Sequence, residues 1–101
     1  MNIIGASFHV GSGGVFAGEY EKVLLDVRKI FDIADEMGLP KMKFLDIGGG
    51  FTCILPGTGK NFDEVAPTIG NLIDKHFPDP TIRVIGEPGR YICESSLYLA
   101  T

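Results

Sequence analysis

The sequence predicts an α/β fold in which a parallel sheet is covered by helices. Three strand-like apolar runs alternate with two helix-like amphipathic segments, and each apolar run ends in a glycine-containing turn. A helix between two consecutive strands implies a right-handed parallel crossover. We therefore expect the order strand, helix, strand, helix, strand, followed by an apolar tail.

The first half of the chain contains one strand and one long helix. Residues 3–10 form an apolar run into the turn "GSGG", and residues 19–37 have helical periodicity. Gly38 suits the position after a helix, and Pro40 prevents its continuation. The apolar residues at helical spacing are Tyr20, Val23, Leu24, Val27, Ile30, Phe31 and Ala34.

The second half repeats this pattern. Residues 42–47 are predicted to form a buried strand, and "GGGFTCILPGTGKN" after them a loop. Asn61 is a candidate N-cap, with Glu64 completing a capping box. The helix should run to about His76, which complements its dipole; Pro67 is tolerable only near the first turn. The expected buried residues are Val65, Ile69, Leu72 and Ile73.

The third strand is predicted at residues 82–85, and residues 95–101 could begin a further strand or helix. All three strands look buried on both faces, as parallel strands usually are. Two helices cannot cover both faces of such a sheet. The chain therefore looks like a section of a TIM-like (β/α)8 barrel, which typically needs about 250 residues. Alone it would expose open strand edges and should be unstable.

Composition excludes several classes of function. The chain has 101 residues, 45% of them hydrophobic, and a net charge of −4, which indicates at most one soluble domain. The mild acidity argues against nucleic-acid binding, and no run is long enough for a membrane span. Cys53 and Cys93 fit neither a disulfide framework nor a CxxC site, so we expect small semi-buried residues in a reducing, cytoplasmic setting.

The three strand ends carry the chemistry. They read "FHVGSGG", "LDIGGGF" and "IGEPGRY", and parallel strands bring such ends to one edge of the sheet. Glycine turns expose backbone N–H groups, Ser12 adds a hydroxyl, and Arg90 adds a bidentate cation. These features predict one anion cradle, with phosphate as the expected anion, rather than glycines that only make tight turns.

Several named motifs are absent. The dinucleotide fingerprint, the Walker A motif and the nucleophile elbow each fail at a required position. A metal site built from His9, Asp46 and Glu87 is a weak rival, because no HxH or HxxxH pair accompanies them. Glu87 could either reach the ligand of Arg90 or form a plain ion pair with it. His9 could lie flat on a ligand ring or be a hydrogen-bonded histidine at a strand end.

The motifs "SFHVGSG", "LDIGGGF" and "EPGRY" together resemble the fold-type III decarboxylases that use pyridoxal 5'-phosphate (PLP), the ornithine, diaminopimelate and arginine decarboxylase family. Gly13 favours the ornithine branch. The resemblance runs from about Gly5 to the end of the chain. It implies an N-terminal barrel and a C-terminal β-domain, with residues 1–101 as a partial PLP-binding barrel domain covering roughly the last three strands.

The resemblance also implies roles for individual residues. His9 would stack on the pyridine ring, and Glu87 would pair with its protonated nitrogen; we count both as catalytic. The phosphate would be held by Ser12, Gly50, Gly89 and Arg90, and the same two glycine motifs add Gly49 and Pro88 to the cofactor-binding set. No metal is implied. The reaction implied for the ornithine branch is the conversion of L-ornithine to putrescine and CO2. The electron-poor ring of the cofactor makes this possible, because it absorbs the electron pair that the departing CO2 leaves behind.

Parts of the family pattern have no counterpart in the chain. The lysine that bonds to the cofactor and the cysteine loop that completes the site across a dimer are both absent, so we expect the chain alone to be inactive. The full-length protein would be a homodimer with an amino-acid substrate, and an antizyme-type regulator is a candidate partner. The alternatives are a non-catalytic relative like the antizyme inhibitors, a diaminopimelate or arginine decarboxylase, and a stand-alone phosphate-binding module.

Overall fold

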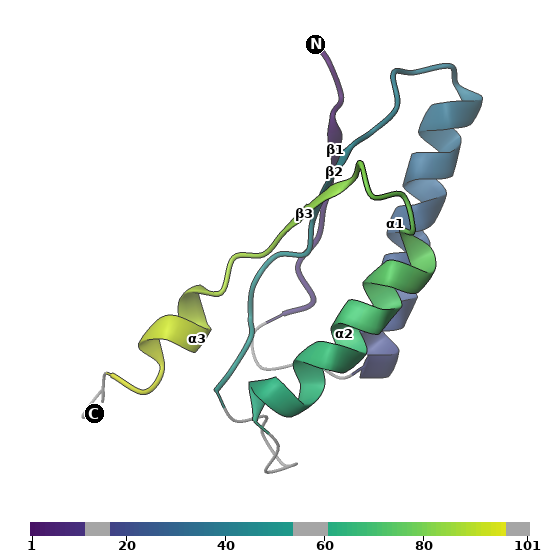
Figure 1. Cartoon of the computed structure of the whole chain (residues 1–101). Helices are drawn as coiled ribbons and strands as arrows, with labels where there is room; N and C mark the ends of the chain where they lie inside the picture. The colour runs from purple at the N-terminus through teal and green to yellow at the C-terminus, as the bar shows by residue number, and fades with distance from the viewer. Residues whose placement is uncertain (12–16, 54–60, 97–101) are drawn as a thin grey trace.

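A computed structural model of the chain describes residues 1–11, 17–53 and 61–96 (Figure 1). The elements in this part are β1 (Gly5–Ser7), α1 (Ala17–Glu36), β2 (Phe44–Asp46), α2 (Phe62–His76), β3 (Arg83–Ile85) and α3 (Gly89–Cys93). The strands lie in the order β1-β2-β3, and both neighbouring pairs are parallel. The predicted α/β class and the order strand, helix, strand, helix, strand are therefore confirmed.

The core lies between the sheet and the two long helices. Leu45 in β2 is paired in register with Ala6 and Val84, and its side chain is fully buried. Figure 1 shows α1 and α2 side by side on one side of the strands. The buried hydrophobic residues are Tyr20, Leu24, Val27, Phe31, Ala34, Met42, Leu45, Phe51, Ile69 and Phe77.

Helix α1 follows the predicted periodicity with one error. The residues expected on its apolar stripe are buried or half-buried, except Ile30, which is 50% exposed. Around the helix axis, Ile30 points away from the direction shared by Val27, Phe31 and Ala34. It therefore lies at the edge of the apolar stripe. Gly38 adopts a φ of 70° just after the helix, as its predicted role requires.

Helix α2 begins as predicted. The Asn61 side chain accepts a hydrogen bond from the Glu64 N–H at 3.1 Å, and the Glu64 carboxylate accepts from the Asn61 N–H at 3.3 Å. The capping box is thus complete. Pro67 lies inside the helix and not in its first turn, contrary to our expectation. His76 is the last residue of α2, and together with Lys75 it contacts Glu21 of α1 at 3.1 and 2.8 Å.

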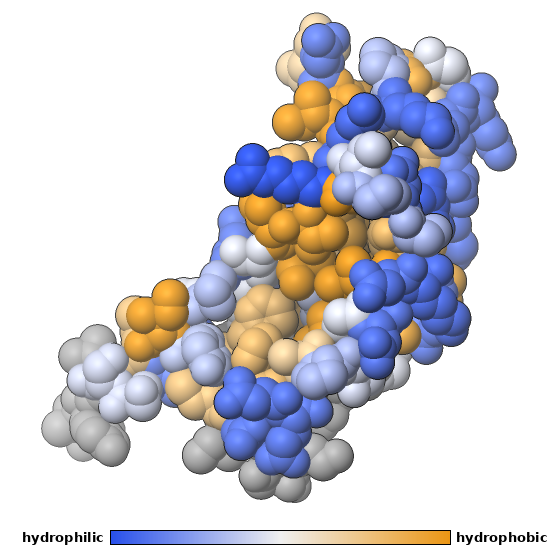
Figure 2. All heavy atoms as spheres, in the orientation of Figure 1, coloured by the Kyte–Doolittle hydropathy of each residue, from blue (hydrophilic) through white to orange (hydrophobic). Residues whose placement is uncertain are grey.

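The strands are shorter than predicted, and within this chain they are not buried on both faces, as we expect where two helices alone cover a three-stranded sheet. Val84 in β3 is 38% exposed, and Ile3 and Ile4 before β1 are exposed. The reason is that α1 and α2 cover one side of the sheet only, while α2 leaves β3 partly uncovered. Figure 2 shows the resulting hydrophobic patch between the strands and α2.

Helix α3 was not expected from the sequence, where proline and glycine indicated only a turn. Pro88 occupies its N-cap, and the helix runs through Arg90 to Cys93. Of the two free cysteines, Cys53 is half-buried as predicted, whereas Cys93 is exposed because it sits on this uncovered helix. The expectation for residues 97–101 lies outside the described residues. No helix of the described part is long and apolar enough to cross a membrane.

Candidate functional site

The backbone ladder of the sheet continues beyond the strands into the three loops that carry the predicted motifs. The Phe8 N–H donates to the Asp46 carbonyl at 3.1 Å, and the Ile47 N–H donates to the Ile85 carbonyl at 2.9 Å. One step further, the Glu87 N–H donates to the Gly48 carbonyl at 2.7 Å. The loops after β1, β2 and β3 are therefore held together at one edge of the sheet, as the topology predicts.

The glycines of the β2 loop are required by close backbone contacts. A Cβ on Gly48 would collide with the Phe8 carbonyl oxygen, and a Cβ on Gly49 would collide with the Glu87 carbonyl oxygen. A Cβ on Gly50 would lie 2.5 Å from the carbonyl oxygen of Gly11. Gly48 and Gly50 also have φ values of 66° and 86°, which favour glycine. The two neighbouring loops thus exclude side chains from the β2 loop.

This glycine loop fits a phosphate group. The Gly49 and Gly50 N–H groups donate to no acceptor within residues 1–11, 17–53 and 61–96, although both glycines are buried. Thr52, just after them, is 2% exposed, and its hydroxyl has no hydrogen-bond partner in that part of the chain. Buried donors without acceptors are unfavourable unless a ligand accepts from them. Sequence reasoning missed Thr52, because no motif marks a lone buried hydroxyl.

Asp46 has a structural contact in the turn. Its Oδ1 accepts a hydrogen bond from the Gly48 N–H at 2.9 Å, which fixes the start of the glycine loop. The pKa of Tyr20 is raised above its ordinary value, first by burial of the hydroxyl and second by the charge of Asp46. Among the described residues, no group of three histidine, cysteine or acidic side chains could hold a metal ion. The rival metal site is therefore unsupported.

His9 lies at the mouth of the cradle. Its side chain is exposed, and its Nδ1 accepts a hydrogen bond from the Gly11 N–H at 2.9 Å. A neutral ring with Nδ1 as acceptor carries its proton on Nε2. The ring also neighbours the β2 loop, since a Cβ on Gly50 would lie 3.2 Å from the His9 Cε1. Both expectations for His9, a hydrogen-bonded side chain and a ring beside the site, are compatible with this position.

The turn at the third strand end places Arg90 at the start of α3. The Gly89 N–H donates to the Glu87 carbonyl at 2.8 Å, and Pro88 is the N-cap. Arg90 donates from Nε at 2.8 Å and from Nη2 at 2.7 Å to Oε1 of Glu94. The described residues contain no ion pair between Glu87 and Arg90, so that alternative is wrong.

Glu94 is a site residue that sequence reasoning missed. Its pKa is lowered from the ordinary value, first by the hydrogen bond from Arg90 and then by the Cys53 N–H. The signal that could have found it is the i, i+4 spacing from Arg90, but that spacing has meaning only on a helix. Ser12, the remaining predicted phosphate ligand, lies outside the described residues.

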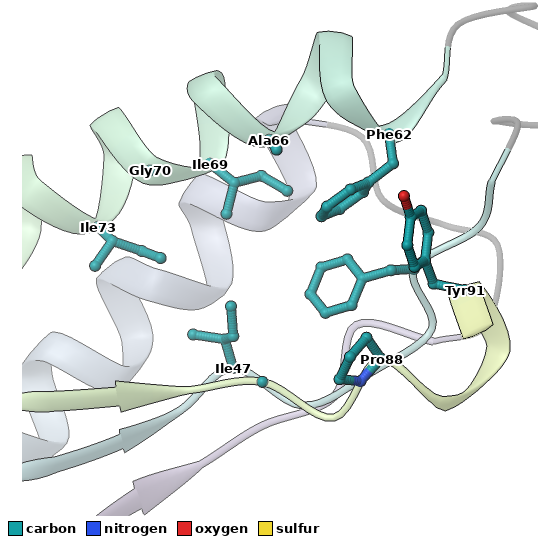
Figure 3. Close-up of a pocket in the computed structure, with 10 residues that line it drawn as sticks. Ile47, Phe62, Ala66, Ile69, Gly70, Ile73, Pro88 and Tyr91 are labelled. Carbon is teal, nitrogen blue, oxygen red and sulfur yellow. The ribbon is translucent and has the colours of Figure 1, made fainter.

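An apolar hollow of about 450 Å³ lies behind the polar loops, between α2 and the ends of β2 and β3 (Figure 3). Its wall includes Pro88 and Tyr91 from the third loop and α3. The rings of Phe51 and Phe62 lie 5.2 Å apart, as do those of Phe62 and Tyr91. The ten lining residues are Ile47, Phe51, Phe62, Ala66, Ile69, Gly70, Ile73, Gly86, Pro88 and Tyr91. None of them is charged, so the hollow is distinct from the polar glycine loop.

Taken together, a parallel sheet, a glycine loop with unused backbone donors and an arginine at the same strand ends are the features expected of a phosphate-binding α/β domain. Residues 1–94 match the family model described as "Pyridoxal-dependent decarboxylase, pyridoxal binding domain". The chain therefore belongs to this family. The match confirms the resemblance found from the sequence and the predicted cofactor, pyridoxal phosphate.

Individual relatives agree with this assignment. The chain is 42% identical to antizyme inhibitor 2 of Xenopus laevis and 43% identical to ornithine decarboxylase of Mus musculus, in each case over 99% of this chain and 22% of the relative. A solved structure of SrLDC in complex with PLP and cadaverine superposes with a TM-score of 0.73 at 44% identity, over 91% of this chain and 24% of that one. The chain thus spans about a fifth of the length of these curated relatives.

Proposed function

We propose that this chain is the cofactor-binding section of a longer PLP-dependent amino-acid decarboxylase. The observation that carries the proposal is the convergence of the glycine cradle with Arg90 at one edge of the sheet. The proposal concerns the longer protein, since the chain itself covers 22% of the length of its curated relatives.

The cradle would bind the phosphate group of the cofactor. The Gly49 and Gly50 N–H groups, which donate to no acceptor in the described part, are suited to phosphate oxygens. Arg90 would add a charge-assisted contact. The Gly89 N–H was expected to donate to the phosphate, but it already donates to the Glu87 carbonyl at 2.8 Å. Gly89 and Pro88 would instead set the turn that brings the Arg90 side chain there. Ser12 would add a hydroxyl donor; it remains a prediction from the motif.

His9 and Glu87 would act on the ring of the cofactor. When bound, that ring accepts the electron pair left when a substrate carboxylate departs as CO2. Glu87 would hold a proton on the ring nitrogen by offering it a negative charge. Its backbone is fixed for this role by the 2.7 Å hydrogen bond to the Gly48 carbonyl. His9 would limit the movement of the ring by stacking on it.

The chain would form three adjacent strands of a barrel, roughly its last three. The parallel order β1-β2-β3, with both helices on one side, is the arrangement of successive barrel units. The uncovered Val84 and the apolar hollow beside α2 lie where the next helix of a barrel would pack. The other side of the sheet would face the barrel interior.

The substrate we propose is L-ornithine, with putrescine and CO2 as products. The 43% identity to a mouse ornithine decarboxylase supports it. The second candidate is a non-catalytic protein, favoured by the 42% identity to antizyme inhibitor 2. We prefer the enzyme because His9, Glu87 and Arg90 are all present, and a protein that binds only a regulator has no need of them. The homodimer, the antizyme-type regulator and the cytoplasmic location remain predictions.

The test is Glu87→Ala in the full-length protein. Turnover of ornithine should fall by about a hundredfold or more, because the ring loses its charge partner, while binding of PLP is largely retained. Glu36→Gln, an exposed change at the far end of α1, is the control and should have wild-type turnover. Unchanged turnover in Glu87→Ala would refute its role. A wild-type protein that binds PLP yet releases no CO2 from ornithine, lysine or arginine would favour the non-catalytic candidate.

A further inference from the structure

We propose that Glu94 is a positioning residue that holds the Arg90 guanidinium in the orientation needed for phosphate and ties α3 to the glycine loop. This inference rests on the proposed function, in which Arg90 contacts the phosphate of the cofactor. It assigns a role to a residue outside the "EPGRY" motif.

The two carboxylate oxygens of Glu94 bind two different segments. Oε1 accepts from Nε and Nη2 of Arg90 at 2.8 and 2.7 Å. Oε2 accepts from the backbone N–H of Cys53 at 3.0 Å. Cys53 belongs to the loop that begins with the glycine cradle, so one side chain connects the cation of the site to the loop with the backbone donors.

These contacts determine how Arg90 is presented. A guanidinium group has a side edge, made of Nε and Nη2, and an end edge, made of its two terminal nitrogens. Glu94 occupies the side edge. Because Glu94 holds the side edge of the planar group, it fixes the direction in which the end edge points, and an anion would bind Arg90 through that edge. The carboxylate remains charged near neutral pH because its contacts favour the ionised form.

Stabilisation of α3 does not explain the pair. Arg90 lies in the first turn and Glu94 at the C-cap, so each charge has the unfavourable sign for its end of the helix. An i, i+4 pair with the base first is also the weaker orientation. What the arrangement does provide is the link across to Cys53. A second link runs parallel to it, since the Cys53 Sγ donates to the Tyr91 carbonyl at 3.1 Å.

Holding Arg90 in place should raise affinity for the phosphate group. The Arg90 side chain is 41% exposed, and a long exposed side chain loses rotamer freedom when it binds an anion. If Glu94 has already restricted the side chain, less freedom remains to be lost on binding. The effect should therefore depend on the phosphate and should be absent for a ligand that lacks it.

The experiment compares PLP with pyridoxal, which lacks the phosphate, in the full-length protein. Glu94→Ala should weaken PLP affinity about five- to thirtyfold and leave pyridoxal affinity within about twofold. Glu94→Gln keeps an oxygen for Arg90 but can no longer accept from both segments, so its loss should be smaller. Asp32→Ala is the matched control: it removes the i, i+4 ion pair of Arg28 on α1 and should change neither affinity.

A double-mutant cycle separates this inference from the proposed function. Arg90→Ala should weaken PLP binding, and adding Glu94→Ala should cause little further loss. If Arg90→Ala leaves PLP affinity unchanged, the proposed function fails. If Arg90→Ala weakens binding but Glu94→Ala does not, or if it tightens binding, only the positioning role fails. Equal losses for PLP and pyridoxal in both Glu94 variants would likewise refute it, since that result indicates a general structural defect.

Discussion

The helix layer and the loop edge of this molecule are specified by different kinds of contact. In the helix layer, large side chains such as Tyr20 and Leu24 from α1 pack against Leu45 of the sheet. At the loop edge, main chain meets main chain, and the glycines at 48–50 leave room for the carbonyls of neighbouring loops. Packing in the helix layer therefore requires large side chains, whereas packing at the loop edge requires residues without a side chain.

This difference separates stability from binding. The helix layer and the strand that it covers should contribute most of the free energy of unfolding, since together they hold most of the buried hydrophobic residues. The loop edge contains the groups we assign to the cofactor. We therefore expect substitutions in the two regions to be distinguishable by measuring unfolding and cofactor affinity in the same variants of the full-length protein.

The largest effect on stability is expected from Leu45→Ala in β2, directly beneath the helix layer. The Leu45 side chain is fully buried, with 0% of its surface accessible, so its truncation leaves a cavity. The free energy of unfolding, measured by denaturant titration, should fall by about 2–5 kcal/mol. Affinity of the folded protein for PLP should change little. A large loss of affinity at preserved fold would contradict the separation of the two regions.

A smaller loss of stability with a larger loss of binding is expected from Gly49→Ala at the loop edge. The added Cβ collides with the Glu87 carbonyl, which forces the β2 and β3 loops apart. The free energy of unfolding should fall by about 1–3 kcal/mol, and PLP binding, followed by its visible absorbance, should be severely weakened.

Gly18→Ala is the matched control for that variant. Gly18 lies in the first turn of α1, and a Cβ there meets nothing within 4 Å. The same chemical change should therefore raise stability by about 0.5–1 kcal/mol, because alanine is the better helix former. Similar binding losses in both glycine variants would show that the close contact at Gly49 is not what matters.

The smallest effect is expected from Glu21→Gln, which tests electrostatics within the helix layer. Glu21 contacts Lys75 and His76 across the two helices, and its pKa is lowered from 4.5, first by the hydrogen bond from Lys75. A lowered pKa in the folded state stabilises the protein above the unfolded value, and this contribution is lost as the pH falls through the folded value.

The wild-type protein should therefore lose more stability than Glu21→Gln between about pH 5 and about pH 3, as measured by thermal unfolding. Glu36→Gln, on the same helix and without an ion pair among the described residues, is the control and should follow the wild type. Identical acid profiles for all three proteins would show that the contacts of Glu21 add nothing to stability.

The sequence predicted the helix layer better than the loop edge. Helix α1 and the capping box of α2 follow from local rules, because periodicity and caps are properties of neighbouring residues. The exposure of Ile30 was not predicted because it lies at the edge of the apolar stripe, where burial depends on what covers the helix. Helix α3 was missed because Pro88 and Gly89 equally indicate a turn, and five residues are too few for a periodic signal.

For the site, sequence reasoning predicted which loops meet but not the contacts between them. Topology alone brings the three strand ends together, so the neighbourhood of His9, the glycine loop and Arg90 could be predicted. The Arg90–Glu94 pair could not, because it requires the unrecognised helix. The roles of the individual residues toward the cofactor remain predictions.

The glycine loop has a consequence for how this sequence can change over evolutionary time. Gly48 and Gly50 are constrained by the backbone after β1, whereas Gly49 between them is constrained by the backbone after β3. Inserting or deleting one residue in any of the three loops would move a side chain into a position that has no space for one. The three loops lie some forty residues apart in the sequence, yet a change in the length of one requires a compensating change in another.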